Sequence, residues 1–101
     1  MKRNEEVIIK TESVTVRVLS LSVGESTPWH FHKEVTDNMF CLSGAIGVLL
    51  RNPHGEISLQ PGQRCEAHAL RVHRVTNMGS KEAKYLLVQG VGHYDFNTVS
   101  P

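Results

Sequence analysis

The spacing of glycine and proline is the feature that most restricts what this chain can form. The segments between these residues are short and rich in Val, Ile, Leu, Thr and Phe. No window of helical length keeps an apolar stripe at i, i+3, i+4 and i+7 free of helix breakers. Short strands separated by turn residues are typical of sandwiches and barrels, so the sequence predicts an all-β fold. The turn residues are Gly24, Pro28, Gly44, Gly47, Pro53, Gly55, Pro61, Gly62 and Gly79.

Nine segments between these turns have the composition of β-strands. They are 6–10, 14–21, 29–32, 37–42, 45–51, 56–59, 64–67, 73–77 and 83–91. Asn52-Pro53-His54-Gly55 predicts a hairpin turn, because proline presets φ and glycine tolerates a positive φ. The 101 residues contain no repeat and no linker, so we expect one domain over residues 1–101.

Alternation predicts the faces of two strands, since successive side chains of a strand point to opposite sides. Arg17 and Arg51 mark the outer face of 14–21 and 45–51, opposite an inner face that carries Ile46, Val48 and Leu50 in the second strand. This assignment leaves Leu19, Leu21 and Leu49 on outer faces. A monomer rarely leaves such an apolar patch in water, so a homodimer is expected.

Charge and composition exclude several kinds of partner. With 11 basic and 10 acidic residues the formal net charge is +1, which offers no attraction for nucleic acid or for an anionic membrane. No apolar run is long enough to span a bilayer. The amino terminus, residues 1–6, is polar and lacks the apolar centre of a secretory signal, and Cys41 and Cys65 have no redox or zinc spacing. We therefore expect a soluble cytoplasmic protein whose two thiols are reduced.

Histidine is the unusual residue of this chain, with six copies. His30 and His32 lie two positions apart on a predicted strand, so both imidazoles project from one face, about 7 Å apart, and can converge on one ion. Asp37 and His73 each begin a later predicted strand, from which they could reach the same ion. Three imidazoles and one carboxylate suit Fe(II), Mn(II), Ni(II), Cu(II) or Zn(II). Alternatively, the histidine pair lies on the surface and Asp37 is a turn acceptor.

Two stretches of the chain resemble the two sequence motifs of the cupin family. Gly24-x5-His30-x-His32-x4-Asp37-x6-Gly44 is similar to the first motif, G-x5-H-x-H-x3–4-E-x6-G. Gly62-x5-His68-x-Leu70-x2-His73-x3-Asn77 is similar to the second motif, G-x5-P-x-G-x2-H-x3-N. The resemblance covers 24–44 and 62–77, and it implies a double-stranded β-helix (jelly-roll) barrel. It also implies that the metal ligands are His30, His32, His73 and Asp37.

Three positions depart from the cupin motifs. Asp37 stands where the family usually has Glu, and it is one methylene shorter, so it could bind the metal directly, through water or not at all. His68 and Leu70 replace Pro and Gly, so the loop between 67 and 72 must turn without a flexible glycine. His68 is either a further site residue or an outward residue, because Arg64, Glu66 and His68 alternate with Cys65 and Ala67.

The cupin resemblance implies a small-molecule site beside the metal. Residues expected to line it are Met39, Cys41, Val48, Leu50, Val75 and His68. Their mostly apolar character favours a small, weakly polar substrate, such as an aromatic compound or a keto acid. Cupins include dioxygenases, isomerases and lyases as well as ligand-binding modules, and fold and metal do not choose between them. We expect a metal-dependent enzyme with one divalent transition metal; the alternative is a non-catalytic ligand-binding or sensing cupin.

Overall fold

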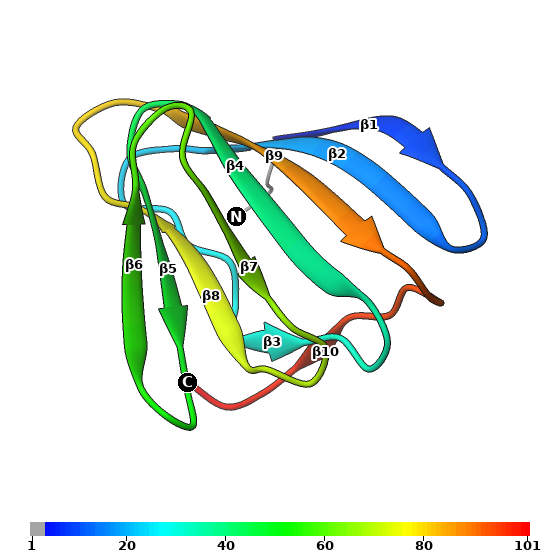
Figure 1. Ribbon diagram of the computed structural model, residues 1–101. Helices are drawn as coiled ribbons and strands as arrows, with labels where there is room; N and C mark the ends of the chain where they lie inside the picture. Colours follow the sequence, from blue (N-terminus) through cyan, green and yellow to red (C-terminus); the bar gives the residue numbers. More distant parts are fainter. Residues whose placement is uncertain (1–3) are drawn as a thin grey trace.

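The computed structural model describes residues 4–101 and consists of β-strands and loops (Figure 1). The strands are β1 (Asn4–Lys10), β2 (Val14–Leu21), β3 (His30–Phe31), β4 (Thr36–Ser43), β5 (Ile46–Leu50), β6 (Gly55–Leu59), β7 (Arg64–Ala67), β8 (His73–Asn77), β9 (Ala83–Gly90) and β10 (Asn97–Thr98). Residues 1–3, part of the polar amino terminus considered above, lie outside the described residues. Within residues 4–101, no helix has the length and apolar character needed to cross a membrane.

Two antiparallel five-stranded sheets form the fold. The first sheet has the order β1-β2-β9-β4-β7, and the second sheet has the order β10-β3-β8-β5-β6. Several neighbours in these sheets are far apart in sequence, as in the pairing of β2 with β9 and of β5 with β8. The all-β fold class is confirmed, and all nine predicted segments contain a strand. Residues 51–54 form the predicted turn between β5 and β6.

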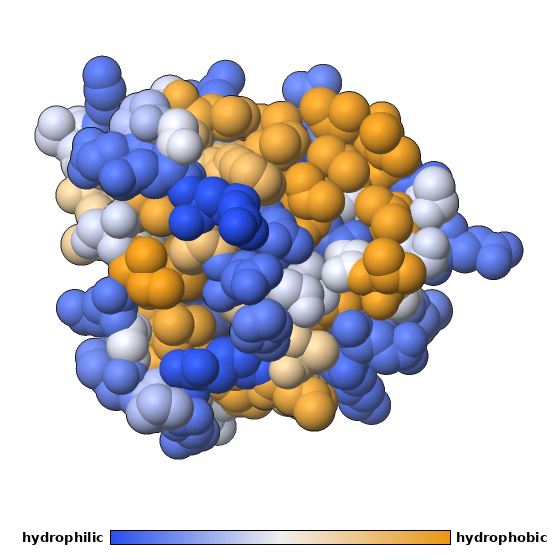
Figure 2. All heavy atoms as spheres, viewed as in Figure 1, coloured by the Kyte–Doolittle hydropathy of each residue, from blue (hydrophilic) through white to orange (hydrophobic). Residues whose placement is uncertain are grey.

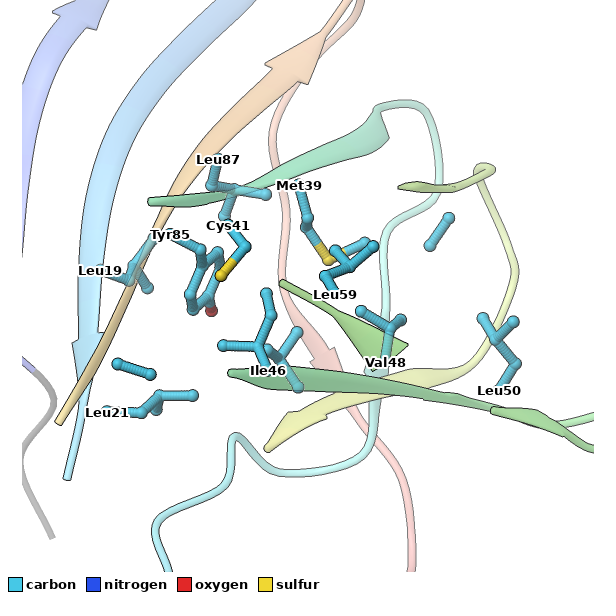
Figure 3. Packing of buried hydrophobic residues seen from close by; sticks show 13 residues of the cluster. Leu19, Leu21, Met39, Cys41, Ile46, Val48, Leu50, Leu59, Tyr85 and Leu87 are labelled. Carbon is cyan, nitrogen blue, oxygen red and sulfur yellow. The ribbon is translucent and has the colours of Figure 1, made fainter. Parts of the chain in front are cut away.

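The core lies between the two sheets and is apolar (Figure 3). Strands alternate buried and exposed residues, which places every second side chain in the core. Ile46, Val48 and Leu50 share the inward face of β5, as predicted. The other labelled side chains in Figure 3 come from β2, β4, β6 and β9. They are Leu19, Leu21, Met39, Cys41, Leu59, Tyr85 and Leu87.

The prediction for the faces of β2 was wrong. Leu19 and Leu21 are fully buried, and Arg17 on the same face is 8% exposed. Arg17 can lie inside because its guanidinium meets the Glu5 carboxylate at 3.2 Å and also donates to the side-chain oxygen of Gln89. Burial of a charge is tolerated when it is paired and hydrogen-bonded. Two leucines on which the homodimer expectation rested therefore belong to the core.

A different surface of the first sheet is apolar. The outward residues of β2 and β9 pair across the strands, Val16 with Val88 and Val18 with Leu86, and all four are partly exposed. Figure 2 shows apolar side chains gathered over this part of the molecule. The homodimer stays a prediction, which is now based on this outer face instead of on Leu19 and Leu21.

The carboxyl-terminal segment adds a strand that the sequence did not predict. β10 pairs with β3, with Asn97 opposite Phe31 and Thr98 opposite His30. The Asn97 side-chain amide also donates to the carbonyl oxygen of Phe31 (3.2 Å). This pairing fixes residues 94–96 beside the two histidines of the first motif and so closes one end of the fold.

Candidate metal centre

Four side chains from distant parts of the sequence meet at one end of the core. His30 in β3 lies directly opposite His73 in β8, Asp37 is the second residue of β4, and His32 follows β3. One ligand atom from each residue lies within 4.8 Å of all the others. All four side chains are buried, with exposures of 5% for His30, 2% for His32 and Asp37, and 1% for His73. The structure therefore brings together all four residues predicted as metal ligands.

Each imidazole is oriented by the main chain. Nδ1 of His30 donates to the carbonyl oxygen of Pro28 at 2.7 Å, and Nδ1 of His73 donates to that of Arg71 at 2.8 Å. Nδ1 of His32 donates to the carbonyl oxygen of Asp95 at 2.5 Å. A carbonyl oxygen can only accept, so every Nδ1 carries a proton. In each neutral ring the Nε2 lone pair is then left for the shared site, an arrangement typical of histidines that bind metal.

The position of Asp37 tests whether these residues fit a metal ion. Its Oδ2 atom lies 3.1 Å from Nε2 of His32 and 2.8 Å from Nε2 of His73. Two lone pairs on neutral rings would face a carboxylate oxygen, which is unfavourable unless positive charge lies between them. Either the rings carry additional protons or a cation occupies the space. Ligands of one ion, each about 2.1 Å from it, lie up to about 4.2 Å apart. The four ligand atoms lie within 4.8 Å of one another, so the group fits a divalent transition metal after its widest separation contracts by about 0.6 Å.

The electrostatics of the four residues agree with such a site. Burial lowers the pKa of His30 to about 4, and the charge of His73 adds to the effect, so His30 is neutral and able to bind a metal. Burial alone would raise the pKa of Asp37, but hydrogen bonds from Nε2 of His32 and His73, which these rings donate when they carry a second proton, hold that pKa well below its ordinary value. Asp37 is therefore a carboxylate. Burial would lower the pKa of His32, but Asp37 outweighs it and raises that pKa.

Sequence reasoning missed two polar residues next to this group. Gln89 in β9 lies opposite Asp37 across the β4–β9 pairing, and its Nε2 donates to Oδ1 of Asp37 at 2.8 Å. Arg17 donates in turn to the side-chain oxygen of Gln89. Gln89 shares the inward face of β9 with Tyr85 and Leu87, and a polar residue among large apolar ones was the available signal. Because both faces of β9 are rich in apolar residues, the sequence alone does not show which face is inward.

A small cavity adjoins the four residues, and the carboxyl-terminal segment covers it. Its free space is about 10 Å³, close to the requirement of one water molecule. The Phe96 ring stacks on His30 at 4.5 Å between centroids, and the Tyr94 ring lies 5.6 Å from His32. No strand was predicted at this position, so the two aromatic residues were not expected to line the site.

The residues predicted to line the substrate site are found in three different places. Met39 and Val75 line the cavity. Cys41, Val48 and Leu50 pack in the apolar core and do not line it. The expectation for His68 as a lining residue is corrected. Its side chain is 75% exposed and lies 3.5 Å from the Glu66 carboxylate. Arg64 and Glu66 point outward from β7, and His68 continues this alternation into the loop.

Comparison with known structures places the fold. The chain aligns over 99% of its length with a double-stranded β-helix protein from Klebsiella pneumoniae, covering 86% of that protein at 21% identity and a TM-score of 0.86. The alignment with KdgF from Halomonas sp. includes 86% of this chain and 76% of KdgF, at 15% identity and a TM-score of 0.76. The alignment with an oxalate oxidase includes 86% of this chain and 46% of the oxalate oxidase, at 17% identity and a TM-score of 0.79. These identities establish a common fold and nothing further.

A comparison of the sequence with protein families agrees with the fold, whereas a search of curated proteins gave no match. The family model described as "Cupin domain" matches residues 17–89, a span that includes His30, His32, Asp37 and His73. With both sheets, the two histidine-bearing motifs and this match in agreement, the chain belongs to the cupin family.

Proposed function

We propose that this cupin binds one divalent transition metal through His30, His32, His73 and Asp37 and uses it in a reaction on a small molecule. The observation that carries the proposal is the orientation of the rings, in which every Nδ1 donates to a main-chain carbonyl. The Nε2 atoms of His32 and His73 are thereby directed at Oδ2 of Asp37. Among the described residues, no lysine or arginine forms an ion pair with this carboxylate. Nitrogen and oxygen donors in this ratio suit Fe(II), Mn(II), Ni(II), Cu(II) or Zn(II).

Four protein ligands leave two positions of an octahedron for other molecules, which a catalytic site requires and a closed structural site does not offer. A metal bound here would supply Lewis-acid or redox chemistry. The surrounding residues of the chain keep bulk water out, since Phe96 and Tyr94 cover the histidines and Met39 and Val75 are apolar. A dry site strengthens each electrostatic contact within it.

The size of the cavity restricts the substrate. Its free space of about 10 Å³ admits little more than one water molecule, so a larger substrate needs the segment at Tyr94 and Phe96 to move. We propose a small substrate of the dioxygenase, isomerase or lyase classes, such as a keto acid or a small aromatic compound. The structurally similar oxalate oxidase acts on a small acid according to its name, which agrees with this class. A cytoplasmic location, in which Cys41 and Cys65 stay free thiols, belongs to the same proposal.

A non-catalytic cupin that holds a small ligand is the second candidate, and the confined cavity favours it. One experiment separates the two functions. The chain is purified without a histidine tag, its metal content is measured by mass spectrometry, and it is incubated with small keto acids and aromatic compounds after loading with Fe(II) or Mn(II). Product formation supports the enzyme, and recovery of an unchanged bound compound supports the binding module. Protein that neither retains nor takes up a transition metal contradicts both.

A further inference from the structure

A chain of polar contacts runs from the surface of the first sheet to Asp37. Glu5 in β1 accepts a hydrogen bond from Nη1 of Arg17 in β2 at 3.2 Å. Nη2 of Arg17 donates to Oε1 of Gln89 in β9, and Nε2 of Gln89 donates to Oδ1 of Asp37 in β4 at 2.8 Å. The contacts cross four neighbouring strands in the order β1-β2-β9-β4. Arg17, Gln89 and Asp37 are 8%, 1% and 2% exposed.

Arg17 decides which way the Gln89 amide points. A guanidinium can only donate, so the group of Gln89 that faces it must be the carbonyl oxygen. The amide nitrogen then faces Asp37, where it donates to Oδ1 and lies 3.5 Å from Nε2 of His32. The reverse orientation would set an NH2 group against Arg17 and an oxygen against the carboxylate, which is unfavourable on both sides.

Gln89 in turn decides which oxygen of Asp37 is available. Oδ1 is occupied by the Gln89 amide, and only Oδ2 faces the histidine nitrogens, at 3.1 Å from His32 and 2.8 Å from His73. An aspartate side chain is short and has few rotamers, so a hydrogen bond to one oxygen fixes the other. Groups that orient a metal ligand in this way change metal affinity on removal by about 10- to 100-fold.

We propose that Gln89 and Arg17 are positioning residues of the metal centre, which act through Asp37 and restrict it to one metal-binding oxygen. The inference rests on the proposed function, because it requires that the four residues bind a metal. Arg17 contributes through Gln89, because its guanidinium donates hydrogen bonds to Glu5 and to Gln89.

The test measures metal affinity by isothermal titration of the purified full-length protein with Mn(II) and with Co(II), together with the absorption spectrum of the Co(II) form. Gln89→Met keeps the length of the side chain and removes both hydrogen bonds. We expect it to weaken metal binding about 10- to 100-fold and to alter the Co(II) spectrum, because Asp37 is no longer fixed. Arg17→Met is expected to act in the same direction, and to add little once Gln89 has been replaced.

The decisive comparison uses the Asp37→Ala background. There Gln89→Met should leave the remaining metal affinity unchanged, because its target is gone. Thr15→Val is the matched control, since Thr15 is buried and lies opposite Gln89 in the β2–β9 pairing without contacting Asp37. Equal loss of affinity with and without Asp37, or wild-type affinity in Gln89→Met, overturns the inference. Failure of the wild-type protein to bind either metal would instead contradict the proposed function.

Discussion

At the scale of single residues, the fixed tautomer of three histidines is the property on which the metal site depends. Each Nδ1 donates to a carbonyl oxygen of the main chain, from Pro28, Asp95 or Arg71. The rings are therefore set by the path of the backbone, and the Nε2 atoms need no further side chain to orient them. Asp37 differs, because its orientation depends on the side chain of Gln89.

This difference predicts unequal effects of removing the ligands. His73→Ala removes an imidazole that is 1% exposed and lies opposite His30, and it leaves only two nitrogen donors. We expect purified His73→Ala protein to retain no metal, whereas Asp37→Ala should retain metal with lower affinity. Metal content after dialysis, measured by mass spectrometry, checks both variants. Exposed His54→Ala serves as the control with normal content, and normal content in His73→Ala would refute the ligand assignment.

At the scale of elements, the loop between β7 and β8 carries local strain. Leu70 has φ = 72°, the left-handed region that leucine disfavours, and its side chain is 66% exposed. Its N–H donates to the carbonyl oxygen of His32 at 2.7 Å, so the turn is tied to the metal site. The cupin motif has glycine at this position, where a positive φ has no steric cost.

Leu70→Gly should therefore raise the free energy of unfolding by up to about 1 kcal/mol, the strain relieved less the entropy that glycine adds to the unfolded chain. Urea denaturation of the apo protein measures the difference. Leu70→Ala is the control, because alanine shortens the exposed side chain and keeps the strain. A stability of Leu70→Gly at or below that of Leu70→Ala would show that the strain of the positive φ does not exceed the entropic cost of glycine, and would contradict the prediction.

The elements also show what sequence patterns can and cannot determine. Strand positions follow from composition and turn residues, which is why β2, β7 and β8 have the predicted bounds. The face of β2 could not be assigned from Arg17, since alternation identifies two faces and only the partners Glu5 and Gln89 make the charged one the inner face. β10 has two residues and exists through its pairing with β3, a contact between distant segments that no local pattern encodes.

The candidate site divides in the same way. His30, His32, Asp37 and His73 were predicted because the two motifs that carry them are linear in sequence and resemble those of cupins. Gln89 and Phe96 reach the site through strand pairing and through the path of the carboxyl terminus, and each is more than 50 residues from His32 in sequence. Their positions required the fold.

At the scale of the whole molecule, the four residues of the candidate metal centre come from both sheets. His30 and His73 belong to the second sheet, and Asp37 with its partner Gln89 belongs to the first. The apolar core around Ile46 and Tyr85 holds the sheets together independently of these residues. A bound ion would add a contact between the sheets at the end where the core gives way to polar side chains.

Metal removal should consequently lower the melting temperature. A ligand bound only by the folded state at about 100 times its dissociation constant stabilises it by about 2.7 kcal/mol. For a domain of this size, that corresponds to a shift on the order of 10 °C. Differential scanning calorimetry of the metal-loaded protein, with and without a chelator, measures the effect. His73→Ala should show no chelator-dependent shift, and an equal shift in that variant would contradict the site.

The homodimer is a prediction at the same scale. Val7, Ile8 and Ile9 of β1 are each more than half exposed, and Ile9 lies opposite Val16 on the apolar outer face of the first sheet (Figure 2). Covering such a surface favours association with a second copy. Sedimentation velocity should give twice the 11.3 kDa mass of one chain. Ile9→Lys should shift the protein to the monomer, whereas Val23→Lys, at another exposed apolar residue, should not.

The anchoring of the imidazoles to main-chain oxygens has a consequence for how such a protein can diverge. No substitution deletes a main-chain carbonyl, so the orientation of the three imidazoles persists through any substitution at other positions that preserves the backbone path. The carboxylate, held by Gln89, lacks this protection. Reprogramming the chemistry of this scaffold by mutation should therefore proceed through positions 37, 89 and 17, while the histidine triad stays constant.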